Sequence, residues 1–135
     1  FCTSRCLVLC DGYFEWQRHA DGTKQPFYIT LEDGGPFVMA GLWAQNTTLT
    51  AQPIESFCVI TTEASEFCRD IHPRMPMILD HTHHQEWLKD SSLDLDTATA
   101  MIRPNSQRLR LSPVSRFVNS PANDSPQCIS PISQA

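Results

Sequence analysis

Hydrophobic and polar residues alternate along much of the chain in the manner of strands. Apolar runs rich in β-branched and aromatic residues recur between turn signals such as Asp11-Gly12 and Asp33-Gly34-Gly35. Short turns of this kind join antiparallel neighbours. The pattern predicts strands at residues 5–10, 13–17, 26–31, 37–43, 57–62, 77–79 and 108–114.

The pattern changes in character in the later part of the chain. It predicts helices at residues 63–70, 81–89 and 93–102. The last helix would begin at Asp94 or Asp96 and stop before Pro104. Polar residues 46–55 predict a variable loop, and residues 120–135 predict a loop or tail whose isolated apolar residues anchor it. The order of elements predicts an α+β fold: a mixed, largely antiparallel sheet or half-closed barrel with short flanking helices.

Composition limits the class of protein. The 135 residues are enough for one domain with its own core, and 41% hydrophobic with 19% charged residues is ordinary for a globular protein. The net charge of -5 argues against a general polyanion binder but allows a small basic groove. Six cysteines without a Cys-x-x-Cys pair predict reduced, mostly structural thiols in an intracellular protein.

The segment Tyr13-Phe14-Glu15-Trp16 places a carboxylate among aromatic residues. Alternation on a strand puts Tyr13 and Glu15 on one face and Phe14 and Trp16 on the other. Partial burial of the carboxylate would suit it to acid–base chemistry. The local sequence alone favours the plainer alternative, in which Glu15 lies on a solvent-exposed face.

The segment Ile71-His72-Pro73-Arg74-Met75-Pro76 predicts a stiff, extended loop, because proline disfavours helical backbone in the residue before it. The loop carries an imidazole and a guanidinium, which are suited to catalysis and to phosphate recognition. In the alternative, His72 and Arg74 only satisfy backbone carbonyls at a turn. Both interpretations stay open at this point.

Other common sites are not indicated. His81, His83 and His84 do not share one helix face and lack a supporting Glu, so no metal site is predicted. The chain has no Gly-x-Ser-x-Gly motif and no glycine-rich phosphate loop. A thiol peptidase that pairs Cys2 or Cys68 with His72 remains as the lowest-ranked hypothesis.

Five ordered blocks together resemble a known family. They are Arg5-Cys6-Leu7-Val8-Leu9-Cys10-Asp11-Gly12-Tyr13-Phe14-Glu15-Trp16, Lys24-Gln25-Pro26-Phe27-Tyr28-Ile29, Met39-Ala40-Gly41-Leu42-Trp43, Val59-Ile60-Thr61-Thr62-Glu63-Ala64 and Asp70-Ile71-His72-Pro73-Arg74-Met75-Pro76-Met77-Ile78-Leu79. Over residues 5–132 the chain resembles the SOS response-associated peptidase family, the abasic site processing proteins.

The resemblance implies a DNA-repair chemistry without a cofactor. Members of the family cleave off their own N-terminus, a hydrolase activity. The N-terminal Cys then crosslinks covalently to the ring-opened abasic site in single-stranded DNA, with lyase-type steps. By this resemblance Glu15 is the catalytic acid–base and His72 assists Schiff-base chemistry. Thr61 lines the same pocket, Arg74 faces DNA phosphate, and Trp16 contacts the DNA.

The start of the chain departs from the family pattern. Phe1-Cys2-Thr3-Ser4-Arg5 is not the family's Met-Cys-Gly-Arg start. The resemblance therefore implies a partial domain at residues 1–132 that lacks roughly the first third, followed by a tail at 133–135. Cys2 is then not the equivalent of the nucleophile, no nucleophile is expected in this chain, and the chain by itself is expected to be inactive.

An alternative function is a catalytically dead remnant of the same fold that binds single-stranded DNA. In either case the expected partners are single-stranded DNA with abasic sites and replication-fork proteins reached through a missing tail, with no membrane. The expected location is intracellular, nuclear in a eukaryote and cytoplasmic in a bacterium.

Overall fold

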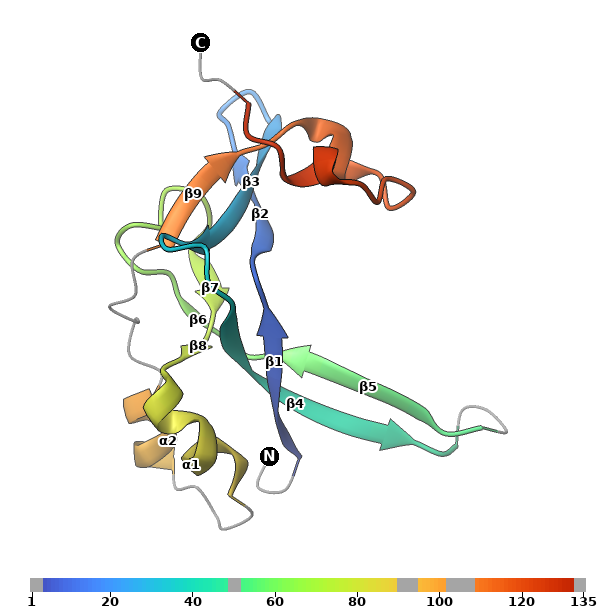
Figure 1. The fold of residues 1–135 in the computed structure, drawn as a ribbon, viewed down its shortest axis with the longest axis vertical. Coiled ribbons are helices and arrows are strands. Elements are labelled where there is room, and N and C mark those ends of the chain that lie inside the picture. Colours follow the sequence, from blue (N-terminus) through green and yellow to red (C-terminus); the bar gives the residue numbers. More distant parts are fainter. Residues whose placement is uncertain (1–3, 49–51, 90–94, 102–108, 133–135) are drawn as a thin grey trace. The chain divides into compact units, whose positions relative to one another are not determined.

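The structure, a computed structural model, describes residues 4–48, 52–89, 95–101 and 109–132 (Figure 1). The chain divides into two compact units, each built from segments that are far apart in the sequence. The first unit consists of residues 1–10, 37–63 and 76–105. The second unit consists of residues 11–36, 64–75 and 106–135.

The first unit contains an antiparallel sheet. Its strands are β1 (Arg5–Cys10), β4 (Phe37–Asn46), β5 (Ile54–Val59) and β8 (Ile78–Leu79). β4 lies between β1 and β5 and also pairs with β8. A side chain at Gly41 of β4 would crowd both neighbouring strands, because an added Cβ would lie 2.8 Å from the sulfur of Cys6 in β1 and 3.1 Å from the carbonyl oxygen of Cys58 in β5.

Residues 46–55, predicted as a loop, include the last residue of β4 and the first residues of β5, which together form a long hairpin. The pairing of β4 with β5 continues outward to Gln45 with Glu55 and Asn46 with Ile54 (Figure 1). The side chains of Gln45 and Glu55 are also joined by a 3.3 Å hydrogen bond. The prediction was wrong at these ends because it rested on polarity, whereas the ladder is made by backbone groups.

A buried arginine ties the first strand to a helix in this unit. Arg5 is only 7% exposed. Its Nε donates a 2.5 Å hydrogen bond to the carbonyl of Trp87, and its Nη2 donates to the carbonyl of Lys89. The guanidinium carbon also lies 5.9 Å from the centre of the Trp87 ring. The indole of Trp87 in turn donates to the carbonyl of Cys6 at 3.0 Å. A charge withdrawn from water needs such partners.

Trp87 belongs to the core of the first unit, with Ala40, Met77, Leu79 and Met101. The helices of this unit are η1 (His81–His83), α1 (His84–Leu88) and α2 (Leu95–Met101). The predicted helix at 81–89 is therefore divided into a 3-10 turn and a short α-helix. Asp80 caps the first part, since its carboxylate accepts from the backbone N–H of Thr82 at 2.9 Å. The helix predicted at 93–102 is confirmed as α2.

The residues predicted to begin and end this helix cannot be compared with the structure. Asp94 and Pro104 lie outside the described residues, as does the side chain of Asp96. The third predicted helix, at 63–70, was wrong. These residues form successive hydrogen-bonded turns in which the carbonyl of Ser65 accepts from Cys68 and Arg69, each at 3.0 Å. The next turn closes on the carbonyl of Cys68, which accepts from Ile71 and His72, so these turns do not form one continuous helical ladder.

The second unit contains a three-stranded antiparallel sheet. Its order is β2 (Tyr13–Arg18), β3 (Lys24–Leu31) and β9 (Leu109–Pro113), so β2 is an edge strand. The turn between β2 and β3 contains Gly22 at φ +83°. In the same turn Asp21 accepts hydrogen bonds from the side chain and backbone of Thr23, which lower the pKa of its carboxyl.

Two 3-10 turns, η2 (Arg116–Asn119) and η3 (Pro126–Ile129), follow this sheet. The predicted apolar anchors of this segment, Ile129 and Ile132, are 45% and 40% exposed, and Cys128 is buried instead at 8%. A backbone hydrogen bond of 2.9 Å from Ile132 to the carbonyl of Pro113 holds the segment to the end of β9.

Two further short strands are β6 (Thr61–Glu63) and β7 (Arg74–Pro76). The predicted α+β class with largely antiparallel strands is confirmed, and the described residues contain no closed barrel. The predicted strand at 57–62 is interrupted between β5 and β6. There the backbone N–H of Ile60 donates to the carbonyl of Ala40. No helix in the described part of the chain is long and apolar enough to cross a membrane.

Substitution of Arg5 tests the buried contact. Arg5→Met keeps an apolar stem but leaves the carbonyls of Trp87 and Lys89 without their donor. We expect a loss of about 2–4 kcal/mol in the free energy of unfolding, measured by urea denaturation. Arg110→Met is the control, because Arg110 is exposed and makes one hydrogen bond to the carbonyl of Glu32. Equal stability of the two variants would contradict this account.

Candidate active site

Glu15 lies in the middle of the edge strand β2, and its side chain is 25% exposed. In the β2–β3 register, Glu15 is opposite Phe27 and Tyr13 is opposite Ile29. Phe27 and Ile29 are buried, at 9% and 1% exposed, so Glu15 lies on the packed face of the sheet. The alternative of a solvent-exposed face is therefore wrong. Its Oε1 accepts a 3.0 Å hydrogen bond from the backbone N–H of Trp16.

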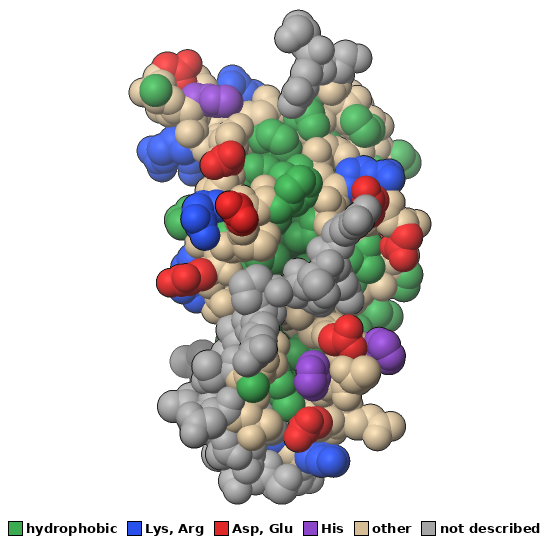
Figure 2. Space-filling view, turned by 90° about the vertical axis from the view of Figure 1, so that its left-hand side faces the viewer, with side chains coloured by type: hydrophobic (Ala, Val, Ile, Leu, Met, Phe, Trp, Pro, Cys, Tyr) green, Lys and Arg blue, Asp and Glu red, His purple; other side chains and the backbone are tan. Residues whose placement is uncertain are grey.

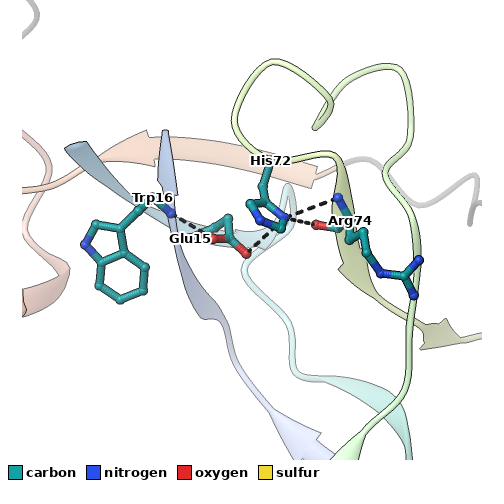
Figure 3. A network of polar contacts seen from close by, with 4 residues as sticks. All are labelled: Glu15, Trp16, His72 and Arg74. Atoms are coloured by element: carbon teal, nitrogen blue, oxygen red, sulfur yellow. Dashed lines mark hydrogen bonds and ion pairs between the residues drawn. The ribbon is translucent and has the colours of Figure 1, made fainter. Parts of the chain in front are cut away.

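His72 faces this carboxylate from the loop before β7 (Figure 3). The Nδ1 atom of His72 lies 3.9 Å from Oε2 of Glu15 and 2.9 Å from the carbonyl oxygen of Arg74. A proton on Nδ1 is donated to the carbonyl of Arg74 and leaves Nε2 with a free electron pair, while the carboxylate of Glu15 lies beyond hydrogen-bond distance. On an unprotonated Nδ1, the backbone N–H of Arg74 donates instead, at 3.2 Å. The ring therefore has a defined partner in each tautomer.

Short contacts hold the loop of His72 in place. The backbone N–H of Ala64 donates to the carbonyl of Pro73 at 2.9 Å, and that of His72 donates to Cys68 at 3.2 Å. The side chain of Gln17 donates to the carbonyl of Asp70 at 2.9 Å. Gln17 is on the same face of β2 as Glu15, because side chains two residues apart share a face. This bond joins the strand of Glu15 to the loop of His72.

Trp16 lies on the other face of β2, as the alternation predicts. Its ring centre is 6.5 Å from that of Phe14, which in turn is 5.1 Å from that of Tyr28. The indole N–H of Trp16 donates to the side-chain oxygen of Asn119 at 2.8 Å. A stack of rings and one hydrogen bond therefore orient this indole.

A cleft of about 510 Å³ surrounds these groups. Its lining consists of Glu15, Trp16, Arg18, Lys24, Arg69, Asp70, Ile71, His72 and Pro73. Glu15, Trp16 and His72 were predicted as site residues, whereas the three cations were not. The structure does not bring the other two predicted residues into the lining. Arg74 meets His72 through its backbone, and Thr61 is an exposed residue of β6 in the first unit.

On the face drawn in Figure 2, acidic and basic side chains are interspersed without a broad field of one sign. A second hollow, of about 420 Å³ in the first unit, is lined mainly by apolar residues. Its lining is Cys6, Leu7, Val8, Trp43, Glu55, Ser56 and Phe57. The chemical groups are thus concentrated in the cleft of the second unit.

Two thiols, those of Cys6 and Cys68, do not have the character of activated nucleophiles. Burial raises the pKa of Cys68, which is 3% exposed. Burial and the neighbouring Cys58 raise the pKa of Cys6. A nucleophilic thiol requires the opposite shift. Cys2 lies outside the described residues. Among the described side chains, no group of three or more His, Cys, Asp or Glu is placed to hold a metal ion.

Comparisons with known proteins agree on one family. The family model described as SOS response associated peptidase (SRAP) matches residues 1–121. Abasic site processing protein YoaM of Bacillus subtilis is 36% identical over 128 residues, which cover 94% of this chain and 56% of that protein. Abasic site processing protein HMCES of Gallus gallus is 35% identical over 148 residues, covering 95% of this chain and 44% of that protein.

A solved structure shows the same fold. The crystal structure of a protein from Bacteroides thetaiotaomicron matches with a TM-score of 0.83 at 29% identity. The match covers 98% of this chain and 58% of that chain. This chain spans about half the length of the curated relatives it matches.

The raised pKa of Cys68 predicts slow alkylation. Its thiol stays protonated at a pH where ordinary thiols have begun to ionise, and burial also blocks the reagent. We expect iodoacetamide at pH 8 to modify the exposed Cys58 first, with Cys68 protected until the chain unfolds. Peptide mass spectrometry measures the order. Preferential labelling of Cys68 would instead support the thiol peptidase hypothesis with His72.

Proposed function

The chain belongs to the SOS response associated peptidase family, and on this premise we propose that Glu15 and His72 are the acid–base pair of a protein that processes abasic sites in single-stranded DNA. The observation that carries the proposal is the 3.9 Å approach of His72 Nδ1 to Glu15 Oε2 at the wall of an open cleft. The names of the relatives, abasic site processing proteins, agree with this substrate.

In the proposed reaction, the amine of an N-terminal Cys attacks the aldehyde of the ring-opened abasic sugar. Loss of one water from the resulting carbinolamine gives a Schiff base. The thiolate of the same Cys then adds to the imine carbon, and the nitrogen takes a proton to complete a thiazolidine. Proton transfers occur at ring opening, at loss of water and at ring closure, and these steps need an acid–base group within reach.

Glu15 and His72 have complementary parts in this scheme. Glu15 is 25% exposed, and a bond to the Trp16 N–H holds one of its oxygens while Oε2 is directed to His72. His72, with its Nδ1 proton held by the carbonyl of Arg74, offers Nε2 as a proton acceptor. The carboxylate acts in ring opening, and the imidazole assists formation and reversal of the Schiff base.

The proposal assigns the nucleophile to an N-terminal Cys other than Cys2, exposed when the protein removes its own N-terminal residue or propeptide. Trp16 stacks on a base, and Arg74 contacts a phosphate. Aromatic stacking next to cations is the usual way in which proteins bind single strands.

Neutral variants of the pair test the proposal. In protein expressed from its complete open reading frame, Glu15→Gln and His72→Gln should each slow covalent adduct formation about 100-fold. The substrate is a single-stranded oligonucleotide with one abasic site, and the adduct is measured on denaturing gels. Glu66→Gln is the matched control, because Glu66 is an exposed carboxylate of the same unit outside the cleft lining.

Three outcomes have different meanings. Adducts at the parental rate in both cleft variants would remove the catalytic roles of Glu15 and His72. A parent protein that binds the oligonucleotide but forms no adduct would favour the alternative of a catalytically dead DNA-binding remnant. No binding at all would contradict the proposed substrate.

A further inference from the structure

The cleft contains three cations that the proposed acid–base chemistry does not use. They are Arg18 at the end of β2, Lys24 at the start of β3, and Arg69 in the turns before His72. Glu15 and Asp70 also line the cleft, so its lining has one net positive charge with His72 neutral. The whole chain has a net charge of -5. The local charge is therefore opposite in sign to the global charge.

Arg18 and Lys24 are direct cross-strand partners in the β2–β3 register. Side chains at such positions begin about 5 Å apart, and like charges there destabilise the sheet. In the part of the chain that the structure describes, no carboxylate lies in ion-pair contact with Arg18, Lys24 or Arg69. The free protein thus holds two repelling cations together at one wall of the cleft.

Arg69 brings a third cation from a separate segment. Its backbone N–H donates to Ser65 at 3.0 Å, and the adjacent carbonyl of Asp70 accepts from Gln17 of β2 at 2.9 Å. These bonds fix the backbone next to Arg69 against the strand that ends in Arg18. Because the backbone at Arg69 is already ordered, its guanidinium loses less conformational entropy on binding an oxyanion than one on a mobile loop would lose.

We propose that Arg18, Lys24 and Arg69 form a subsite for the phosphodiester backbone of single-stranded DNA beside the abasic nucleotide. The inference rests on the proposed function and adds phosphate contacts distinct from Arg74. Trp16 and Arg18 are two residues apart on β2 and so share a face, about 6.6 Å apart along the strand. Trp16 can therefore stack on a base while Arg18 contacts the phosphate next to that base.

An anion at this subsite also relieves the repulsion between Arg18 and Lys24. Binding and folding are then linked, since a ligand that binds only the folded protein stabilises it. A single strand carries a phosphate at each nucleotide, so one strand along the cleft can reach both the pair and Arg69. At the two arginines, bidentate hydrogen bonds to phosphate add directional specificity to the electrostatic attraction.

The salt dependence of DNA binding tests the subsite. The probe is a fluorescein-labelled single strand with a tetrahydrofuran abasic analogue, which cannot form the adduct, and binding is followed by anisotropy over a range of salt concentrations. Each lost phosphate contact should reduce the slope of log K against log salt by about 0.7. We expect a reduction of about 1.4 for Arg18→Gln/Lys24→Gln and about 0.7 for Arg69→Gln.

Lys89→Gln is the control for loss of one exposed cation, because Lys89 lies in the first unit and outside the cleft lining. Its slope should match that of the parent. A parent that binds the probe, with unchanged slopes in all cleft variants, would overturn the subsite and leave the proposed function intact. If the parent does not bind the abasic probe, binding of oligothymidylate that depends on the three cations would support the subsite while the proposed function fails. No binding to either strand would overturn both.

Charge inversion gives an independent measurement. Lys24→Glu places a carboxylate opposite Arg18, so the free protein should gain about 1–3 °C in Tm while its DNA binding weakens. A purely structural role for Lys24 predicts no loss of DNA binding in this variant. Weakened stability together with parental DNA binding would overturn the proposal.

Discussion

The antiparallel pairing of β2 with β3 determines where each functional side chain of the second unit lies. With Glu15 opposite Phe27, the carboxylate is on the packed face, and with Arg18 opposite Lys24, two cations meet at the turn end of the hairpin. A shift of one residue would exchange the two faces of the strand. The hydrogen-bonded turn that contains Asp21, Gly22 and Thr23 closes this hairpin and so contributes to its register.

The acid–base pair and the indole of the candidate site lie within one unit, although they are distant in the sequence. The edge strand supplies Glu15 and Trp16, and the loop before β7 supplies His72, with Gln17 bonded to Asp70 between them. Because β2 is the last strand of its sheet, residues on both of its faces reach the same cleft. An inner strand, with neighbours on both sides, offers no such access. The edge position thus explains how Glu15 on one face of β2, and Trp16 and Arg18 on the other face, all line the same cleft.

Local pattern predicted the strands well, because alternation and turn residues act over a few positions. It also placed Glu15 and Trp16 on opposite faces. It did not predict that Arg18 and Lys24 would be partners, since that depends on the length and closure of the turn. It was wrong about a helix at 63–70, where Ser65 accepts two turn hydrogen bonds. The local pattern also did not predict the burial of Arg5, because the carbonyls that Arg5 contacts, at Trp87 and Lys89, are more than 80 residues away in the sequence.

The hydrogen bond between the Glu15 carboxylate and the Trp16 N–H bears on the behaviour of the protein in concentrated solution. An edge strand with free backbone donors is a template on which another extended chain can add, and such addition begins many fibrils. On β2 one of these donors is occupied by a side chain of the strand itself. A glutamine at position 15 retains an oxygen for this purpose, whereas an alanine does not. The residue assigned to chemistry thereby also protects the exposed edge of its own sheet against strand addition.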